Sequence, residues 1–299
     1  MSQAISASTM QSYGLERVCR VWAIARSTVY RLCRGKGAPV VTVELTKRGP
    51  EGACSDAELA RRIRQALDDS PWVGEGYRKV WARLRATGTR TAARRVLRVM
   101  REQGLLAPSR SGHPHGPKAH DGTIIPERPD QRWGTDQTTT LTGEGNAAIF
   151  ILVDHCTAEC LGIHAARNGT RFEALEPTRQ AVWESFGGFE PGVAKGTELR
   201  HDHGSPFVSH VFQQEIALLG LESSPSYVRE PEGNGCAERF IRTLKEQLLW
   251  LRRFETVEEL RLALLDFKDR YNNEWLIERH GWISPAEQRR RLIGIQAAA

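Results

Sequence analysis

Three acidic residues have types and spacing that suit metal-dependent chemistry. Asp136 lies in a Trp-Gly-Thr-Asp run, and 35 residues separate Asp202 from Glu238. Asp202 closes a predicted strand, whereas Glu238 falls in the first turns of a predicted helix. Two strand-borne aspartates and a helix-borne glutamate can converge on a pair of hard divalent cations, which prefer oxygen ligands and can clamp both the attacking and the leaving oxygen of a phosphodiester. The spacing therefore predicts phosphoryl chemistry on a polynucleotide.

The elements expected to position these acids form an α/β pattern. Apolar or β-rich runs at 133–141 and 147–154 flank a Thr-Gly-Glu-Gly turn and predict a hairpin. Further strands are expected at 160–165, 197–202 and 221–226, and helices at 170–186, 209–219, 234–252 and 257–271. Pro177 is expected to kink or break the first of these helices. This order predicts a mixed sheet with helices on its faces.

The helix that carries Glu238 has two distinct faces. Its apolar stripe is predicted to contain Ala237, Ile241, Leu244, Leu248 and Leu251. Glu238, Arg242 and Lys245 lie at helical spacing on an adjacent face. Glu238 is therefore expected to bind metal while Arg242 and Lys245 reach a neighbouring phosphate.

Charge is unevenly divided along the 299 residues. Residues 1–110 hold 21 Lys and Arg against 9 Asp and Glu, a balance of +12, and the remainder has a balance of −6. A basic N-terminal third favours contact with a polyanion such as nucleic acid. The alternative is a solvated, arginine-rich helical surface.

The N-terminal region, residues 1–107, is expected to bind DNA through helices. Residues 11–34 resemble a helix-turn-helix, with Val29 and Leu32 facing inward and Arg26, Arg31 and Arg34 facing out. Three more helices are predicted within 55–107, and the last of them carries Arg94 and Arg98 as candidate phosphate contacts. Five prolines in 108–131 predict a linker before a catalytic core at 132–293 and a tail at 294–299.

Several other classes of protein are disfavoured. No run of 18 apolar residues is present and the N-terminus lacks a secretory pattern, so a cytoplasmic protein without membrane spans is expected. The six cysteines form no Cys-x-x-Cys pair, which favours reduced thiols over a disulfide framework or a closed zinc site.

Several motifs together resemble one known family. They are Trp133-Gly-Thr-Asp136-Gln-Thr, Asp202-His-Gly-Ser-Pro-Phe-Val-Ser, Asn234-x-x-x-Glu238 followed by Lys245, and Tyr271-Asn272 followed by Ser284-Pro285-Ala286. The chain is similar to OrfB-type transposases of insertion sequences built from OrfA and OrfB reading frames, which belong to the DDE, retroviral-integrase-like superfamily. The resemblance implies a ribonuclease H-like mixed sheet flanked by helices, preceded by an all-α, helix-turn-helix-like DNA-binding region.

The same resemblance implies a function. Such a transposase cleaves and joins DNA at element ends through Asp136, Asp202 and Glu238, with two Mg²⁺ ions that Mn²⁺ can replace. Its partners would be double-stranded DNA, further copies of itself on that DNA, and OrfA, either separate or fused by frameshifting. Asn234 and Lys245 would contact DNA. The chain departs from the family at His203, where Asn or Arg is more frequent.

Two rival functions remain open from the residues alone. One is a DNA-binding regulator with an idle core, and the other is a ribonuclease H-like nuclease without strand transfer. His201, His203 and His210 also invite a role as ligands or a general base. Because His201 and His203 flank Asp202 in an alternating segment, their side chains are expected to point away from its face, in loop or DNA-contact roles.

Overall fold

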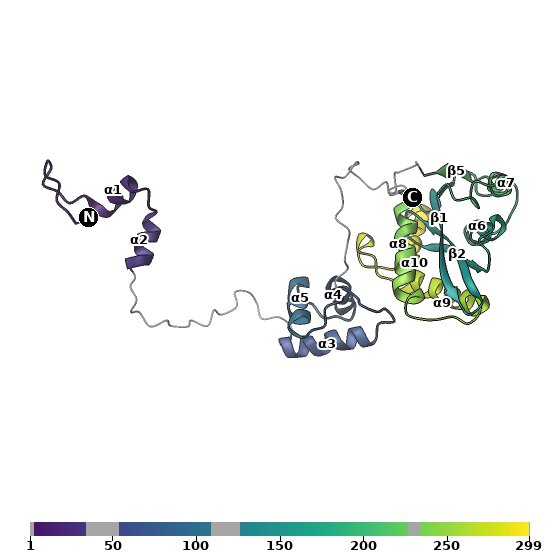
Figure 1. Ribbon diagram of the computed structural model, residues 1–299, viewed down its shortest axis with the longest axis horizontal. Helices are drawn as coiled ribbons and strands as arrows, with labels where there is room; N and C mark the ends of the chain where they lie inside the picture. Colours follow the sequence, from purple (N-terminus) through teal and green to yellow (C-terminus); the bar gives the residue numbers. More distant parts are fainter. Residues whose placement is uncertain (1–2, 34–53, 109–125, 227–233, 299) are drawn as a thin grey trace. The chain divides into compact units, whose positions relative to one another are not determined.

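The computed structural model describes residues 3–33, 54–108, 126–226 and 234–298 of a chain that divides into two units, Met1–Glu51 and Gly52–Ala299 (Figure 1). The first unit contains α1 (Gly14–Val21) and α2 (Arg26–Cys33), so two short helices are confirmed there. Arg26 and Arg31 are exposed as predicted, but Leu32 is 74% exposed rather than inward-facing. Arg34 lies outside the described residues.

The second unit begins with three helices that share a small core. These are α3 (Asp56–Asp68), α4 (Tyr77–Ala86) and α5 (Ala93–Glu102). Ser55 caps α3, because its hydroxyl accepts a hydrogen bond from the Glu58 backbone N–H at 3.2 Å. The buried side chains between the helices are those of Leu59, Ala60, Ile63, Val80, Leu84, Val96, Val99 and Met100.

A five-stranded mixed sheet follows. Its strands are β1 (Arg132–Thr142), β2 (Gly145–Asp154), β3 (Cys160–Ala166), β4 (Glu198–His201) and β5 (Glu222–Pro225), in the order β3-β2-β1-β4-β5. The first three strands are antiparallel, whereas β4 runs parallel to β1 and β5 parallel to β4. The predicted mixed sheet is confirmed, and β1 lies at its centre.

Helices cover both faces of this sheet (Figure 1). On one face, α6 (Arg171–Phe186) and α7 (His210–Leu219) pack against Phe150 and Leu152 of β2. On the other, α8 (Gly235–Leu244) and α9 (Val257–Glu274) pack against Ile151 and Val153. The alternation of buried side chains along β2 explains its continuous apolar sequence, since both faces are covered.

Helix α6 continues through Pro177 without the break that the sequence suggested as one outcome. A side chain on Gly162 of β3 would place its Cβ only 2.1 Å from the Pro177 carbonyl oxygen, so the helix backbone lies directly on the strand. Proline cannot donate the backbone hydrogen bond of this position, and α6 continues without it. Glycine at position 162 is therefore a requirement of the sheet–helix contact.

The helix that begins at Gly235 changes its winding at Lys245. Residues Lys245–Leu249 form a π-helical turn, where an uninterrupted α-helix was expected. Because a π turn holds more residues than an α turn, the buried stripe shifts along the chain. Leu249 is buried and Leu251 is 56% exposed, so the predicted inward position of Leu251 is wrong.

The C-terminal elements complete the unit. A short 3₁₀ helix (Glu278–His280) and α10 (Pro285–Ala298) follow α9. Arg289 of α10 binds Asp130 at 2.6 Å and lies within 3.6 Å of Asp154, which ties this helix to the ends of β1 and β2. Within the described residues, no helix is both long and apolar enough to cross a membrane.

Candidate active site

Strand alternation places Asp136 on the sheet face that α8 covers. Asp136 lies opposite Ile151 in the β1–β2 register, and Ile151 packs with α8 and α9. In β4, Leu199 packs with α6 and α7, so the next residue, Arg200, lies on the α8 face. The same alternation places Asp202, which directly follows β4, on the α8 face. Glu238 is in the first turn of α8 itself. Three residues far apart in sequence are thus carried by elements that meet on one side of the sheet.

The charges of these residues influence one another. The pKa of Asp136 is raised to about 6, mainly by burial and further by the negative charges of Asp202 and Glu238, while the Lys245 ammonium group acts in the opposite direction. Burial also raises the pKa of Glu238. Asp136, Asp202, Glu238 and Lys245 therefore share one electrostatic environment.

Local hydrogen bonds hold the two aspartates. A carboxylate oxygen of Asp136 accepts from the Gln137 backbone N–H at 2.7 Å. Asp202 is exposed and accepts from the Gly204 backbone N–H at 2.8 Å. A Cβ on Gly204 would lie 2.8 Å from that same oxygen, so a residue without a side chain permits this turn.

In the part of the chain that the structure describes, no group of three or more His, Cys, Asp or Glu side chains is close enough together to hold a metal ion. The three acids are therefore close enough to interact by charge but not arranged as a closed ligand set.

Replacing Asp136 with Asn is expected to stabilise the protein in the absence of divalent ions. The pKa of Asp136 is about 6 when folded and near its usual 3.8 when unfolded, so the folded chain holds the extra proton between these values. The free energy of unfolding of the wild type should fall as the pH rises from 4 to 6. The Asp136→Asn variant has no carboxyl group to titrate at this position, so it avoids this fall in the free energy of unfolding, which is on the order of 1–3 kcal/mol. Urea unfolding at pH 4 and pH 7.5 measures the difference, and an equal effect at both values would contradict it.

Asn234 occupies a buried position next to the acids. Its side chain is 6% exposed, and its Nδ2 donates to the Thr135 carbonyl oxygen at 3.0 Å. Asn234 was expected to contact DNA, but this burial gives it a contact with β1 instead. Arg242 and Lys245 lie further along α8 and its π turn; Arg242 is exposed and pairs with Glu246 at 3.0 Å.

The two candidate arginines of α5 differ in their surroundings. Arg98 binds Asp56 at 2.7 Å and Glu102 at 2.9 Å. Its hydrogen bond, with that of Arg95, lowers the pKa of Asp56 to about 2. Arg94 is exposed. Arg98 therefore serves the packing of α5 on α3, and Arg94 is the stronger candidate for a phosphate contact.

The histidines around Asp202 follow the predicted alternation. His201 is buried among Phe207 and Phe212 on the α7 face, and burial lowers its pKa. Its Nδ1 donates to the Asp202 carbonyl oxygen at 2.7 Å, and its Nε2 lies 2.9 Å from the Ser223 hydroxyl. His201 therefore points away from the acids and has a structural role rather than a DNA contact. His203 and His210 are exposed.

Two arginines on the α8 face were missed by sequence reasoning. Arg132 and Arg200 both bind Glu198, at 2.6 and 3.0 Å, and Arg200 also donates to the Ser224 hydroxyl at 3.0 Å. They precede Asp136 and Asp202 at even spacing on β1 and β4. That alternation of charged residues in two strands was the signal that could have identified them.

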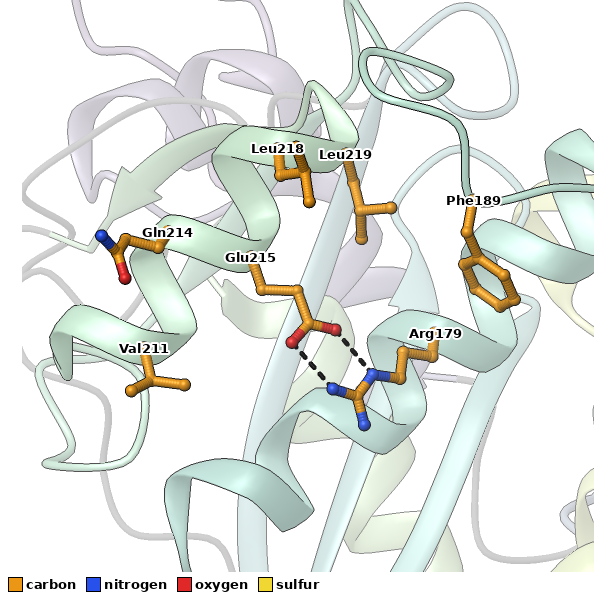
Figure 2. Close-up of a pocket in the computed structure, with 7 residues that line it drawn as sticks. All are labelled: Arg179, Phe189, Val211, Gln214, Glu215, Leu218 and Leu219. Carbon is orange, nitrogen blue, oxygen red and sulfur yellow. Dashed lines mark hydrogen bonds and ion pairs between the residues drawn. The ribbon is translucent and has the colours of Figure 1, made fainter.

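A cavity of about 510 Å³ lies between α6 and α7 (Figure 2). Phe189, Val211, Leu218 and Leu219 line it, and its two charged residues bind each other, since the Arg179 guanidinium donates to the Glu215 carboxylate at 2.6 and 2.7 Å. The cavity is on the sheet face opposite the acids. It is therefore a separate feature from the candidate active site.

The five-stranded mixed sheet with helices on both faces has the arrangement of a ribonuclease H-like, integrase-type core. Residues 126–231 and 219–285 match the integrase core domain, and residues 54–113 match an HTH-like domain. These domains, together with homology to the transposases of two insertion sequences, support a DNA transposase of the integrase type. The HTH-like match covers α3–α5 and not residues 11–34, where a helix-turn-helix was expected.

Relatives span most of the chain. It is 28% identical over 287 residues to the transposase for insertion sequence element IS629 of Shigella sonnei, covering 93% of this chain and 92% of that one. It is 30% identical over 201 residues to transposase InsD of the IS2 elements of Escherichia coli, covering 65% of each. Among solved structures, the catalytic core domain of BIV integrase has 19% identity and a TM-score of 0.40, covering 56% of this chain and 97% of that one.

Proposed function

We propose that Asp136, Asp202 and Glu238 hold divalent metal ions and carry the cleavage and strand transfer of DNA at insertion-element ends. The observation that supports this is the raised pKa of Asp136, to which the charges of Asp202 and Glu238 contribute. Carboxylates brought within reach of each other are unfavourable without a counter-charge. A divalent cation bound among the three carboxylates would neutralise their negative charges and remove that repulsion.

The donor chemistry fits magnesium. Mg²⁺ takes oxygen ligands and is usually held by one or two carboxylates together with substrate phosphate oxygens, and Mn²⁺ accepts the same ligands. When bound, two such ions would supply charge stabilisation for both the attacking and the leaving oxygen of a phosphodiester. Asp136 must give up its proton on binding, which its raised pKa allows above about pH 6.

Basic side chains would orient the DNA. The ammonium group of Lys245 lowers the pKa of Asp136 through its positive charge, and we propose that the same charge attracts a phosphate held at the acids. Arg242 is exposed on α8 and Arg94 on α5. These residues, with Arg26, Arg31 and Arg34 of the N-terminal unit, supply phosphate contacts that position the double-stranded DNA without reading its sequence.

The assembly would contain more than this single chain. Joining two DNA ends requires two sets of contacts, so a homo-oligomer on DNA is proposed, acting in the cytoplasm. Relatives named for insertion elements support element ends as the substrate. Additional end recognition would come from OrfA, as a separate partner or a fusion.

The deciding experiment is an end-cleavage and joining assay on the DNA that flanks the gene, with Mg²⁺, Mn²⁺ or EDTA and with or without OrfA. We expect a free 3′-hydroxyl at the element end and joined products that depend on the divalent ion. Cleavage without any joining under all conditions would identify a nuclease. Binding without cleavage would identify a regulator, and either outcome would overturn the proposal.

A further inference from the structure

Gly134 of β1 lies between two polar side chains from other parts of the chain. A Cβ at this position would be 2.4 Å from His155 Nε2 and 2.5 Å from Asn234 Oδ1. Both distances are far shorter than any real contact of a Cβ, so only glycine allows the two side chains to approach the strand here. Gly134 is two residues before Asp136 and therefore on the same face of β1.

The two polar atoms beside Gly134 are complementary. Within the described residues, neither His155 Nε2 nor Asn234 Oδ1 has a hydrogen-bond partner of standard geometry, and both are buried. An imidazole N–H donates and an amide oxygen accepts, so each atom supplies what the other lacks. Burial, helped by the positive charges of Arg132 and Arg200, lowers the pKa of His155 to about 4. The Asn234 side chain, as a hydrogen-bond partner, acts in the opposite direction but is a smaller effect. His155 is thus a neutral imidazole that can present one N–H to Asn234.

The other end of the same amide is already fixed. Asn234 Nδ2 donates to the Thr135 carbonyl oxygen at 3.0 Å, so its Oδ1 must face His155. The backbone around His155 is fixed as well. Its N–H donates to the Arg132 carbonyl oxygen, and its own carbonyl oxygen accepts from the Arg279 guanidinium, both at 3.0 Å. The pair therefore connects the end of β2 to β1 and to the start of α8.

We propose that the His155–Asn234 pair is a positioning device that fixes the first turn of α8 against β1 and so sets the separation of Glu238 from Asp136. Asn234 immediately precedes α8, and Glu238 follows one helical turn later. Neither residue of the pair touches the reacting atoms. The inference rests on the proposed function, because it concerns how two of the proposed ligands are brought to one ion.

A variant series in the full-length chain tests this role. His155→Leu removes the donor, whereas His155→Gln keeps an amide N–H. His164→Leu is the matched control, because His164 lies on β3 and binds Glu173 at 2.6 Å, outside the pair. His155→Leu should weaken Mn²⁺ binding, measured by water-proton relaxation, and slow cleavage by about 10- to 100-fold. His155→Gln and His164→Leu should stay within about 3-fold of the wild type.

The double variant His155→Leu/Asn234→Ala should be no weaker in Mn²⁺ binding than the more affected single variant, because Asn234→Ala already removes the interaction that His155→Leu removes. Multiplicative effects would overturn the proposal, and so would a His155→Leu variant with wild-type Mn²⁺ affinity. The variant Asp136→Asn distinguishes failure of the positioning role from failure of the proposed function. If both Asp136→Asn and His155→Leu leave Mn²⁺ binding unchanged, the proposed function fails. If Asp136→Asn abolishes Mn²⁺ binding while His155→Leu does not, only the positioning role fails.

A measurement on the wild type avoids any dependence on folding of the variants. Selective ¹⁵N labelling of histidine reports the tautomer and charge of each ring. His155 should be neutral and carry its proton on Nε2 between pH 5.5 and 8, since its pKa is about 4. A proton on Nδ1 would leave Nε2 without a hydrogen to donate and would overturn the proposal.

Discussion

Replacing Asp136 with Asn is expected to abolish Mg²⁺-dependent cleavage and joining of element ends while leaving DNA binding nearly unchanged. The amide is neutral and one of its two heteroatoms is a donor, so it cannot supply the charge that a divalent ion requires from this position. Loss of several kcal/mol of charge stabilisation corresponds to a rate at least about a thousandfold lower. Asp202→Asn and Glu238→Gln should have effects of similar size.

Single-turnover cleavage of a labelled element end measures the rate, and a gel-shift titration measures binding. Asp266→Asn is a suitable control, because Asp266 is an exposed residue of α9 that pairs with Arg270 at 3.3 Å. It should cleave at the wild-type rate. If one of the three acid variants kept wild-type strand transfer, that residue would have no ligand role; if all three did, the proposed chemistry would fail.

The sequence predicted the sheet and its helices well because strong local patterns specify them. Strands β1 and β2 are long apolar or β-branched runs around a turn, and α7 begins after Ser209, whose side chain accepts from Phe212 N–H. Alternation also placed His201 away from the face of Asp202. These features depend on short-range periodicity, which a single sequence contains.

Other features depend on contacts between distant residues. The π turn at Lys245–Leu249 has no local signature in an otherwise regular helix, so Leu251 was assigned to the wrong face. The family resemblance implied a DNA contact for Asn234, whereas its side chain is buried and bonds to Thr135, 99 positions earlier. His155 suggested only an incomplete zinc half-site with Cys156 and Cys160, which lacks a second pair of ligands. Its place beside Gly134 follows from the β2–β1 register and the position of α8, which only the folded chain defines.

Trp72 joins the HTH-like domain to the integrase core. It lies in the loop between α3 and α4 and is 4% exposed, yet it packs with the core of α8 and α9 rather than with that of its own three helices. Its ring meets Phe267 and Trp275 edge to face, with centroids 5.8 and 5.0 Å apart. The backbone of the next residue, Val73, exchanges two hydrogen bonds with Gln247, at 2.8 and 2.9 Å.

Trp72→Ala is therefore expected to lower the free energy of unfolding by about 3–5 kcal/mol, the usual cost of deleting a buried aromatic side chain. The matched control is Trp250→Ala, since Trp250 is 70% exposed and its removal should change stability by no more than ~0.5 kcal/mol. Urea unfolding followed by circular dichroism compares the two variants. Equal effects in both would show that burial of Trp72 contributes nothing specific.

The form of the Trp72→Ala transition carries as much information as its midpoint. The helices α3–α5 keep their own buried cluster around Leu59, Ile63 and Met100, which Trp72 does not share. Losing the tryptophan should thus separate two cores that remain individually packed. Unfolding of the second unit, Gly52–Ala299, should then split into two steps where we expect one for the wild type. Hydrogen exchange would then be faster in α3–α5 than in β1 and β2. A single, fully cooperative transition at lower urea would instead mean that the Gln247 and Arg78–Glu278 contacts couple the two parts without Trp72.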